Sequence, residues 1–173
     1  MTAFDDWPWQ YSFPPFFTVQ PNLQTRKIQL AAWCDLVLKY HKANNLYVLD
    51  IREAQSSPLF HNVDISRKLS IEGISEVMTE MHRRHNAEPL DKTKTRWHIL
   101  WHTLDEWAAI LYSWADDTGQ LGGVCTFYEI ANTPGKEFSG IDQDVLLKAM
   151  RKLEQRKKAE VIHLDDGNGV KFF

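Results

Sequence analysis

The side chains with the clearest capacity for chemistry lie near the start of the chain, and their chemistry is the burial of apolar surface. Residues 4–17 contain seven of the chain's 21 aromatic residues, together with three prolines. Fully burying one Phe side chain is worth about 1.5–3 kcal/mol, and proline reduces the conformational entropy that a peptide loses on binding. We therefore predict that this segment docks on a protein surface. The candidate docking residues are Trp7, Pro8, Trp9, Tyr11, Phe13, Pro14, Pro15, Phe16 and Phe17.

The prolines restrict the backbone of this segment. Proline lacks an N–H group and disfavours helical geometry at the residue before it, so we expect no α-helix here. The alternation of Trp7, Trp9, Tyr11 and Phe13 with other residues is typical of an extended strand with one apolar edge. Two fates remain open, because the segment either folds back on the first domain or inserts into a partner. We favour insertion, since several aromatic anchors can hold a stable complex.

Residues that serve catalysis or metal binding are present but form no recognisable site. His82 and His85 are three residues apart, without a third ligand at metal-binding spacing. Gly119, Gly122 and Gly123 lack the Lys-Ser/Thr pair of a phosphate-binding loop. No Ser-His-Asp or Cys-His arrangement stands out. We therefore expect no enzymatic activity, no cofactor and no metal.

Charge is distributed unevenly along the chain. The formal net charge is -3, and residues 103–173 contain eight Lys and Arg against 12 Asp and Glu. An acidic surface suits a basic protein partner. The candidate contacts are Glu129, Asp142, Asp144, Asp165 and Asp166. Helix capping and turn formation explain each of these acids equally well when it is taken singly.

The elements that must position these residues occur in the same order twice. In the first half, the pattern predicts a helix over 25–41, a strand over 46–49, a short helix within 53–60, a helix capped by Ser70 and a hairpin over 89–101. In the second half, Thr103-Leu-Asp-Glu106 has the spacing of a capping box at a helix start. A strand over 124–128, a brief helix, a helix opened by Asp142 and a hairpin over 160–173 follow.

The two halves also match residue by residue. Trp33-x-x-Leu36-Val37 corresponds to Trp107-x-x-Ile110-Leu111, and the second copy continues an apolar stripe to Trp114. Helix–strand–helix–helix–hairpin is the winged-helix order. The predicted fold class is therefore mostly α with small β wings, as two tandem winged-helix domains preceded by an extended arm. The expected boundaries are 1–22 for the arm, 23–102 for the first domain and 103–173 for the second.

Winged helices often bind DNA through their third helix, so a nucleic-acid-binding transcriptional regulator is the alternative function. Glu72, Glu76 and Glu80 on the first such helix would face phosphates. A basic run over 148–158 on the second is also explained by favourable charge at a helix C-terminus. We therefore expect no nucleic-acid partner.

The compartment is predicted from what the chain contains. The sequence begins with acidic rather than basic residues and has no apolar signal-peptide core, and no uncharged run approaches the roughly 20 residues of a membrane span. Its two cysteines, Cys34 and Cys125, provide no disulfide framework. We expect a cytoplasmic protein whose association with any membrane is peripheral.

Several stretches, in one order along nearly the whole chain, carry a family resemblance. The chain resembles the small subunit of the ESCRT-II endosomal sorting complex (the vacuolar protein sorting-associated protein twenty-five family). The matching stretches are Trp7–Asn22, Leu30-Ala-Ala-Trp-Cys34, Glu53–Phe60, Leu90-Asp-Lys92 and Gly169-Val-Lys-Phe-Phe173. The resemblance implies a tandem winged-helix scaffold without catalysis, acting in the sorting of ubiquitinated cargo into multivesicular bodies.

The resemblance also implies partners and docking motifs. It implies a heterotetramer on endosomal membranes, in which two copies of this chain bind one copy each of two larger subunits. Pro-Pro-x-Tyr-like motifs of the family dock on winged helices of those subunits. Pro14–Phe17 matches the second motif, with Phe17 in place of Tyr, while Trp7–Tyr11 takes the place of the first but departs from it. The second winged helix is implied to recruit the first ESCRT-III subunit through a basic helix of that partner.

Overall fold

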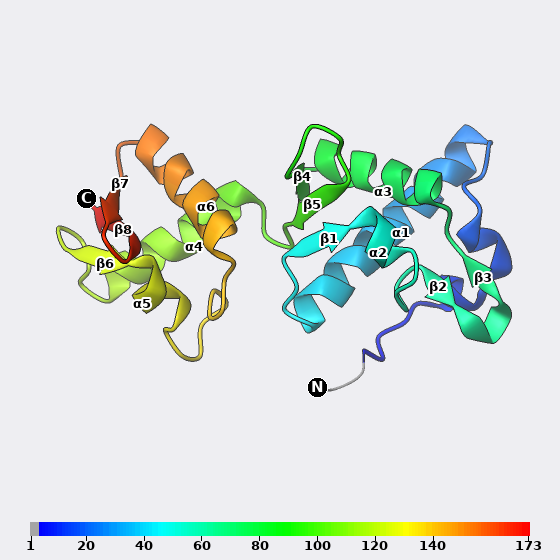
Figure 1. Cartoon of the computed structure of the whole chain (residues 1–173), viewed down its shortest axis with the longest axis horizontal. Helices are drawn as coiled ribbons and strands as arrows, with labels where there is room; N and C mark the ends of the chain where they lie inside the picture. The colour runs from blue at the N-terminus through cyan, green and yellow to red at the C-terminus, as the bar shows by residue number, and fades with distance from the viewer. Residues whose placement is uncertain (1–3) are drawn as a thin grey trace. The chain divides into compact units, whose positions relative to one another are not determined.

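The chain forms two compact units. The computed structural model describes residues 4–173. Unit 1 spans Met1–Trp101 and unit 2 spans His102–Phe173, and Figure 1 labels the elements of each. No helix among residues 4–173 is long and apolar enough to cross a membrane.

Unit 1 is a winged helix preceded by a short, irregular segment. Its elements are the 3₁₀ turns η1 (Trp9–Ser12) and η2 (Pro14–Phe17), helix α1 (Leu23–Ala43), strand β1 (Val48–Asp50), helix α2 (Ile51–Ala54), strand β2 (His61–Asn62), turn η3 (Val63–Ile65), strand β3 (Arg67–Lys68), helix α3 (Ile71–Arg83) and strands β4 (Ala87–Pro89) and β5 (Arg96–Ile99). Strands β1, β5 and β4 form an antiparallel sheet in that order.

Local signals place the two long helices of unit 1. The Asn22 side chain accepts a hydrogen bond from the Thr25 N–H group, and the Ser70 side chain accepts one from Gly73, so each caps the helix that follows. The apolar faces of α1 and α3 then meet in a core from which water is excluded. Its fully buried members include Trp33, Leu36, Val37, Ile74, Val77, Met78 and Met81.

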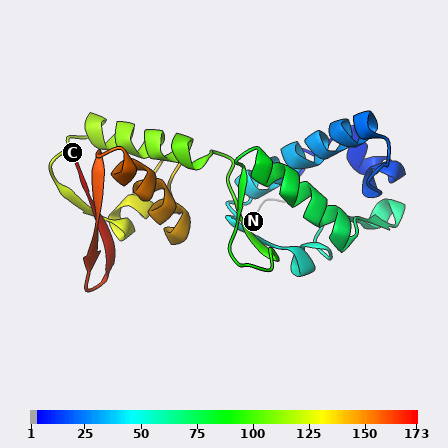
Figure 2. The same cartoon turned by 90° about the horizontal axis from the view of Figure 1, so that it is seen from above.

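Unit 2 repeats this architecture. Its elements are α4 (Leu104–Asp117), β6 (Val124–Thr126), α5 (Phe127–Ala131), α6 (Gln143–Gln155), β7 (Ala159–Leu164) and β8 (Gly167–Phe172). The sheet order is β6-β8-β7, antiparallel throughout, which is the order of β1-β5-β4 in unit 1. Figure 2 shows the β7–β8 hairpin projecting as the wing. The predicted fold, two tandem winged helices, is confirmed.

The start and the wing of unit 2 form for local reasons. Thr103 and Glu106 make both hydrogen bonds of the capping box that their spacing predicts. The wing turns at Asp165-Asp166-Gly167, where the glycine φ of +131° lies in a region that L side chains rarely adopt. Strands β2 and β3, by contrast, were absent from the sequence prediction, since two residues each are too few to show a period.

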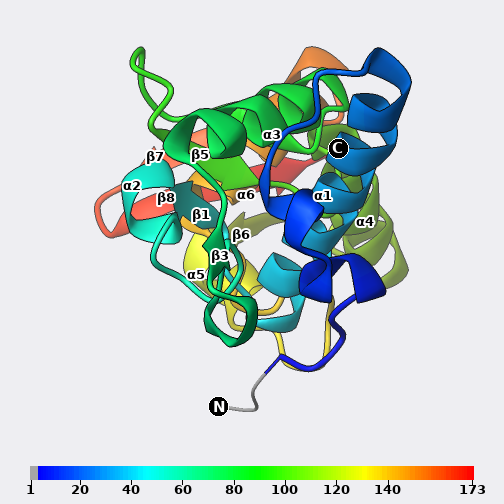
Figure 3. The same ribbon diagram turned by 90° about the vertical axis from the view of Figure 1, so that its right-hand side faces the viewer.

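The N-terminal segment differs from its prediction. Residues 9–17 form two 3₁₀ turns and not an extended strand. The segment, which we call the arm (residues 4–22), folds against α1 as part of unit 1, as Figure 3 shows for the dark-blue ribbon. A 3₁₀ turn requires only one i→i+3 hydrogen bond, so it tolerates prolines that an α-helix does not.

Candidate protein-docking site

The 3₁₀ turns sort the arm's aromatic residues onto two sides. Trp7 and Tyr11 stack with ring centroids 3.9 Å apart and are half-buried. Asn62 Nδ2 donates to the Tyr11 carbonyl oxygen at 2.7 Å, and the Tyr11 hydroxyl donates to the Pro58 carbonyl oxygen. Burial raises the pKa of Tyr11 to about 12, with a smaller contribution from the Asp64 carboxylate. These rings therefore fasten the arm to its own unit.

Phe16 and Phe17 lie deeper still. Each is 3% exposed. The Phe16 ring stacks on the Trp33 indole at 4.1 Å, and Trp33 Nε1 donates to the Phe16 carbonyl oxygen at 2.9 Å. The Phe17 ring meets the same indole edge-on at 5.4 Å. We predicted these two side chains as docking contacts, and the structure instead places them in the core of unit 1, because Trp33 offers a large apolar surface that the arm covers.

The outer side of the arm carries the rings that remain accessible. Trp9 is 70% and Phe13 is 48% exposed, and their centroids lie 5.6 Å apart. Pro14 and Pro15 are exposed beside them, whereas Pro8 is half-buried. Of the nine predicted residues, four thus present an apolar surface to solvent together.

A groove of about 390 Å³ runs between this outer side and α1. Trp9, Phe13 and Pro15 line it from the arm, and Ile28 and Ala32 line it from α1. Ile28 is 73% exposed and was missed by the sequence reasoning. A single exposed apolar residue is no signal in a sequence, and Ile28 becomes informative only beside Trp9 and Phe13, with which it forms one contiguous apolar surface.

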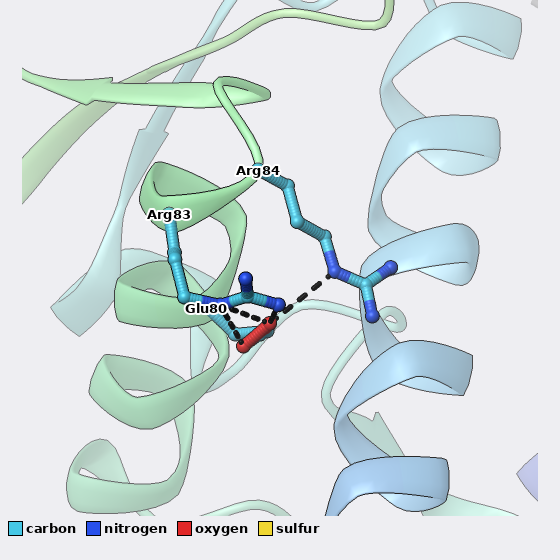
Figure 4. Close-up of polar contacts among 3 residues, drawn as sticks. All are labelled: Glu80, Arg83 and Arg84. Atoms are coloured by element: carbon cyan, nitrogen blue, oxygen red, sulfur yellow. Dashed lines mark hydrogen bonds and ion pairs between the residues drawn. The ribbon is translucent and has the colours of Figure 1, made fainter.

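A second groove, of about 560 Å³, begins on the other side of Ile28. Leu23, Leu30 and Ala31 supply its apolar wall, and Lys27, Arg83 and Arg84 give it a basic rim. Figure 4 shows how that rim is ordered, with the Glu80 carboxylate accepting from Arg83 Nε at 2.9 Å and from Arg84 Nε at 3.4 Å. The Arg83 hydrogen bond is the main cause that lowers the pKa of Glu80. Glu80, which also lines the groove, thus neutralises part of this basic rim.

The predicted acidic contacts of unit 2 lie on three elements. Asp142 caps α6 by accepting from the Asp144 and Val145 N–H groups at 2.9 and 3.0 Å. The Glu129 carboxylate accepts from the Thr126 hydroxyl at 3.1 Å at the start of α5. Capping, the alternative left open for these acids, therefore accounts for Asp142 and Glu129.

The remaining acids are more available. Asp144 is exposed in the first turn of α6, where a negative charge is favoured by the helix dipole. Asp165 and Asp166 are exposed at the tip of the wing. These three side chains are accessible to a basic partner.

Unit 2 also has an apolar groove that was not predicted. It measures about 470 Å³ and lies between α4 and the loop before α6. Its lining residues include Ala109, Ile110, Ser113 and Trp114, with the charged residues Asp117, Lys136 and Glu137. Ile110 and Trp114 belong to the apolar stripe that the sequence predicts for α4, and both are half-buried. Ala109 and Ser113, four residues apart, leave room for the close approach of a partner helix.

The basic run on α6 is partly neutralised within the unit. Arg151 pairs with Glu154 at 2.8 Å, and Arg156 pairs with Asp105 at 2.7 Å. Paired guanidinium groups release fewer counterions from a nucleic-acid backbone. The geometry thus does not favour the nucleic-acid alternative.

Comparisons with known proteins agree with one another. A family model described as "ESCRT-II complex subunit" matches residues 10–142. Curated proteins named "Vacuolar protein-sorting-associated protein 25" are similar over nearly their whole length. The zebrafish (Danio rerio) protein is 50% identical, covering 97% of this chain and 98% of its own, and the human (Homo sapiens) protein is 47% identical, covering 97% of each.

Solved structures give the same result. The crystal structure of subunit VPS25 of the endosomal trafficking complex ESCRT-II matches with a TM-score of 0.85 at 30% identity, covering 95% of this chain and 97% of that one. A crystal structure of the endosomal complex ESCRT-II, described as VPS22/VPS25/VPS36, contains a chain that matches with a TM-score of 0.82 at 30% identity, covering 95% and 98%.

Proposed function

The chain belongs to the ESCRT-II complex subunit family, and from that premise we propose that it is a non-catalytic scaffold subunit of an ESCRT-II complex. It docks on two larger subunits through unit 1 and recruits ESCRT-III through unit 2, in multivesicular-body sorting of ubiquitinated cargo. Two copies join one copy of each larger subunit, in the cytoplasm and at the endosomal membrane surface. The similar VPS25 chain in the VPS22/VPS25/VPS36 crystal structure supports the assembly role.

One observation carries the docking proposal: the exposed pair Trp9 and Phe13 beside the groove of Ile28. A contiguous exposed apolar patch, unlike a single exposed ring, marks an interaction site. Trp is also enriched among the residues that dominate binding energy. A partner side chain that fills the groove would bury both rings and Ile28 at once. Pro14 and Pro15 lie beside this contact, while Phe16 and Phe17 hold the arm from below.

The double substitution Trp9→Ala/Phe13→Ala tests the docking site. Full burial of each ring is worth about 1.5–3 kcal/mol, and 1.4 kcal/mol is tenfold in Kd, so binding is expected to weaken roughly 100-fold. Titration calorimetry of the full chain with the two larger subunits gives the Kd. The control is Val63→Ala, which removes a side chain 70% exposed elsewhere on unit 1. Equal affinities of the double variant and the wild type would rule out this site.

For ESCRT-III, the groove on α4 is the proposed seat of a basic amphipathic helix. The helix would place small or apolar side chains against Ile110 and Trp114 and basic ones toward Asp117 and Glu137. Asp144, Asp165 and Asp166, which do not line the groove, would raise the association rate by electrostatic attraction. Glu129 and Asp142 stay in the proposed surface as predicted acidic contacts that also serve at helix starts.

A peptide of the first ESCRT-III subunit's basic helix provides the measurement, by fluorescence anisotropy. Trp114→Ala is expected to weaken binding at least tenfold, since the groove loses its largest wall. Asp165→Asn/Asp166→Asn is expected to change Kd less than threefold and to reduce its dependence on salt. Tyr128→Ala, at a side chain 74% exposed on α5, is the matched control. A Trp114→Ala variant that binds as tightly as the Tyr128→Ala control would show that the groove is not the seat.

A further inference from the structure

Gln29 is a buried polar residue in the first half of α1, and within residues 4–173 its side chain makes its hydrogen bonds to the arm. The residue is only 7% exposed. Its Nε2 donates to the carbonyl oxygens of Pro15, Phe16 and Thr18 at 3.2, 3.0 and 2.8 Å. Its Oε1 accepts from the Gln20 N–H group at 3.0 Å. The side-chain amide of Gln29 thus forms hydrogen bonds both to η2, at Pro15 and Phe16, and to the segment between η2 and α1, at Thr18 and Gln20.

The arm requires hydrogen-bond donors from other residues because it is rich in proline. Two of its residues in η2 are prolines, which have no N–H group to satisfy neighbouring carbonyl oxygens. Donors must therefore come from side chains, and Gln29 shares the task with the Gln20 amide and the Trp33 indole. Gln29 and Trp33 are four residues apart and so lie on one face of α1. This face of α1 therefore provides two of the hydrogen-bond donors that hold η2.

The hydrogen bonds of Gln29 affect the proposed docking surface through η2. Phe13 directly precedes this turn, and Pro15 within it lines the same groove as Ile28 and Ala32. If η2 left α1, the groove would lose its arm wall and the Trp9–Phe13 pair would lose its support. Gln29 also lines this groove, but it is only 7% exposed and its amide atoms are bonded to the arm, so its influence on binding would pass mainly through the arm.

We propose that Gln29 is a positioning residue that holds the arm in its docking-competent shape, so that unit 1 presents a preformed surface and not a flexible peptide. The inference rests on the proposed docking function. A surface that is already ordered avoids the entropy loss of ordering on binding. Apparent affinity falls in proportion to the fraction of molecules in the competent shape. The arm's openness in the free chain therefore sets its affinity for the partner.

The isosteric substitution Gln29→Glu tests this directly. It removes the two amide hydrogens and sets a carboxylate oxygen against the carbonyl oxygens of Pro15, Phe16 and Thr18. Hydrogen–deuterium exchange of the isolated full chain is expected to approach the rate of an unprotected chain in peptides covering residues 9–22. The Phe16 and Thr18 amides, which close η2, lie in that stretch. Gln143→Glu, at an exposed glutamine of unit 2, gives the same charge change without the effect.

The partner measurement uses the same variants with the two larger subunits. The Kd of Gln29→Glu is expected to rise by the factor by which the closed fraction of the arm falls, and mainly through a slower association rate. A purely structural role would not produce this proportionality. Exchange in the arm that stays protected would overturn the proposal, and so would unprotected exchange with unchanged affinity.

A second variant guards against general unfolding. If Gln29→Glu also quickens exchange in α3, Gln29→Met replaces it, since methionine keeps the length and removes the hydrogen bonds without adding charge. The same proportionality is then required of Gln29→Met. The failure of the docking function is separable, because Trp9→Ala/Phe13→Ala tests that function alone. If Trp9→Ala/Phe13→Ala loses binding while Gln29→Met frees the arm and still binds normally, only the positioning role of Gln29 is rejected.

Discussion

The two winged helices share a fold but differ in what covers their first helix. In unit 1 the arm covers α1, with the Phe16 ring stacked on Trp33. Leu36, at the matched position one turn further on, is 1% exposed. Its counterpart in unit 2, Ile110, is half-buried and lines an open groove. The same helix face is therefore closed by the chain itself in one unit and left accessible in the other.

Buried polar groups follow the same division. Among residues 4–173, the four buried polar residues, Gln29, His41, Asn62 and His98, all lie in unit 1. Gln29 and Asn62 donate to carbonyl oxygens of the arm. A segment without regular pairing brings backbone groups into the core, and each of them requires a partner. Covering a helix with an irregular arm thus requires polar residues in the core beneath it, and unit 2 has no such requirement.

The strongest test of this comparison is Phe16→Ala/Phe17→Ala. Truncating a buried Phe costs about 3–5 kcal/mol, and a whole domain is typically stable by about 5–15 kcal/mol. The double variant is therefore expected to unfold much of unit 1 and to leave unit 2 folded. Hydrogen exchange read separately for the two units, with urea denaturation, measures this.

The matched control is Phe13→Ala, at a ring that is 48% exposed. It is expected to change stability by less than about 1 kcal/mol, because little buried surface is lost. A double variant as stable as this control would show that the arm decorates unit 1 without supporting it.

The second prediction is that low pH destabilises unit 1 more than unit 2. Burial lowers the pKa of His41 to about 4, opposed by its hydrogen bond to the Val37 carbonyl oxygen. The folded state thus holds a neutral imidazole that the unfolded chain protonates below about 6.5. Stability is complete above pH 6.5 and falls as the pH drops toward 4, by about 2 kcal/mol at pH 5 and roughly 3 kcal/mol at pH 4.

Urea denaturation at several pH values, read by exchange in each unit, checks this expectation. His41→Gln removes the titration and is expected to flatten the response of unit 1 between pH 6.5 and 5. Unit 2 serves as the internal control. If the wild-type unit 1 has the same free energy of unfolding at pH 7 and pH 5, buried His41 does not distinguish the units.

The difference between the units also marks what the sequence could predict. Caps, turns and helical stripes depend on neighbours within a few residues, so Ser70, the Thr103 box and the Asp165-Asp166-Gly167 wing turn were predictable. The duplication was predictable for the same reason, since Trp33 and Trp107 sit in matching local patterns.

The arm was not predictable in this way. The spacing of Trp7, Trp9, Tyr11 and Phe13 fits the two-residue period of a strand. It fits equally well the observed arrangement, in which Trp7 pairs with Tyr11 on one side and Trp9 pairs with Phe13 on the other. The choice depends on Gln29 and Trp33, which are distant in sequence. For Ile110 and Trp114, the stripe showed which face of α4 is apolar but not whether anything covers it. Coverage is a property of tertiary structure or of the assembly.

The smallest expected effect concerns the starts of the two matched helices. Thr103 and Glu106 exchange two hydrogen bonds at the start of α4, whereas Asn22 makes one, to Thr25, at the start of α1. Losing an N-cap side chain costs typically about 1 kcal/mol, within a range of roughly 0.5–2. Because unit 1 has the arm's hydrogen bonds to keep the start of α1 in place, Asn22→Ala is expected near the lower end and Thr103→Ala near the upper end. Thr103→Ser, which keeps the hydroxyl, should be nearly neutral. Thermal unfolding of the three variants ranks them, and a larger loss for Asn22→Ala than for Thr103→Ala would mean that the arm does not hold the helix it covers.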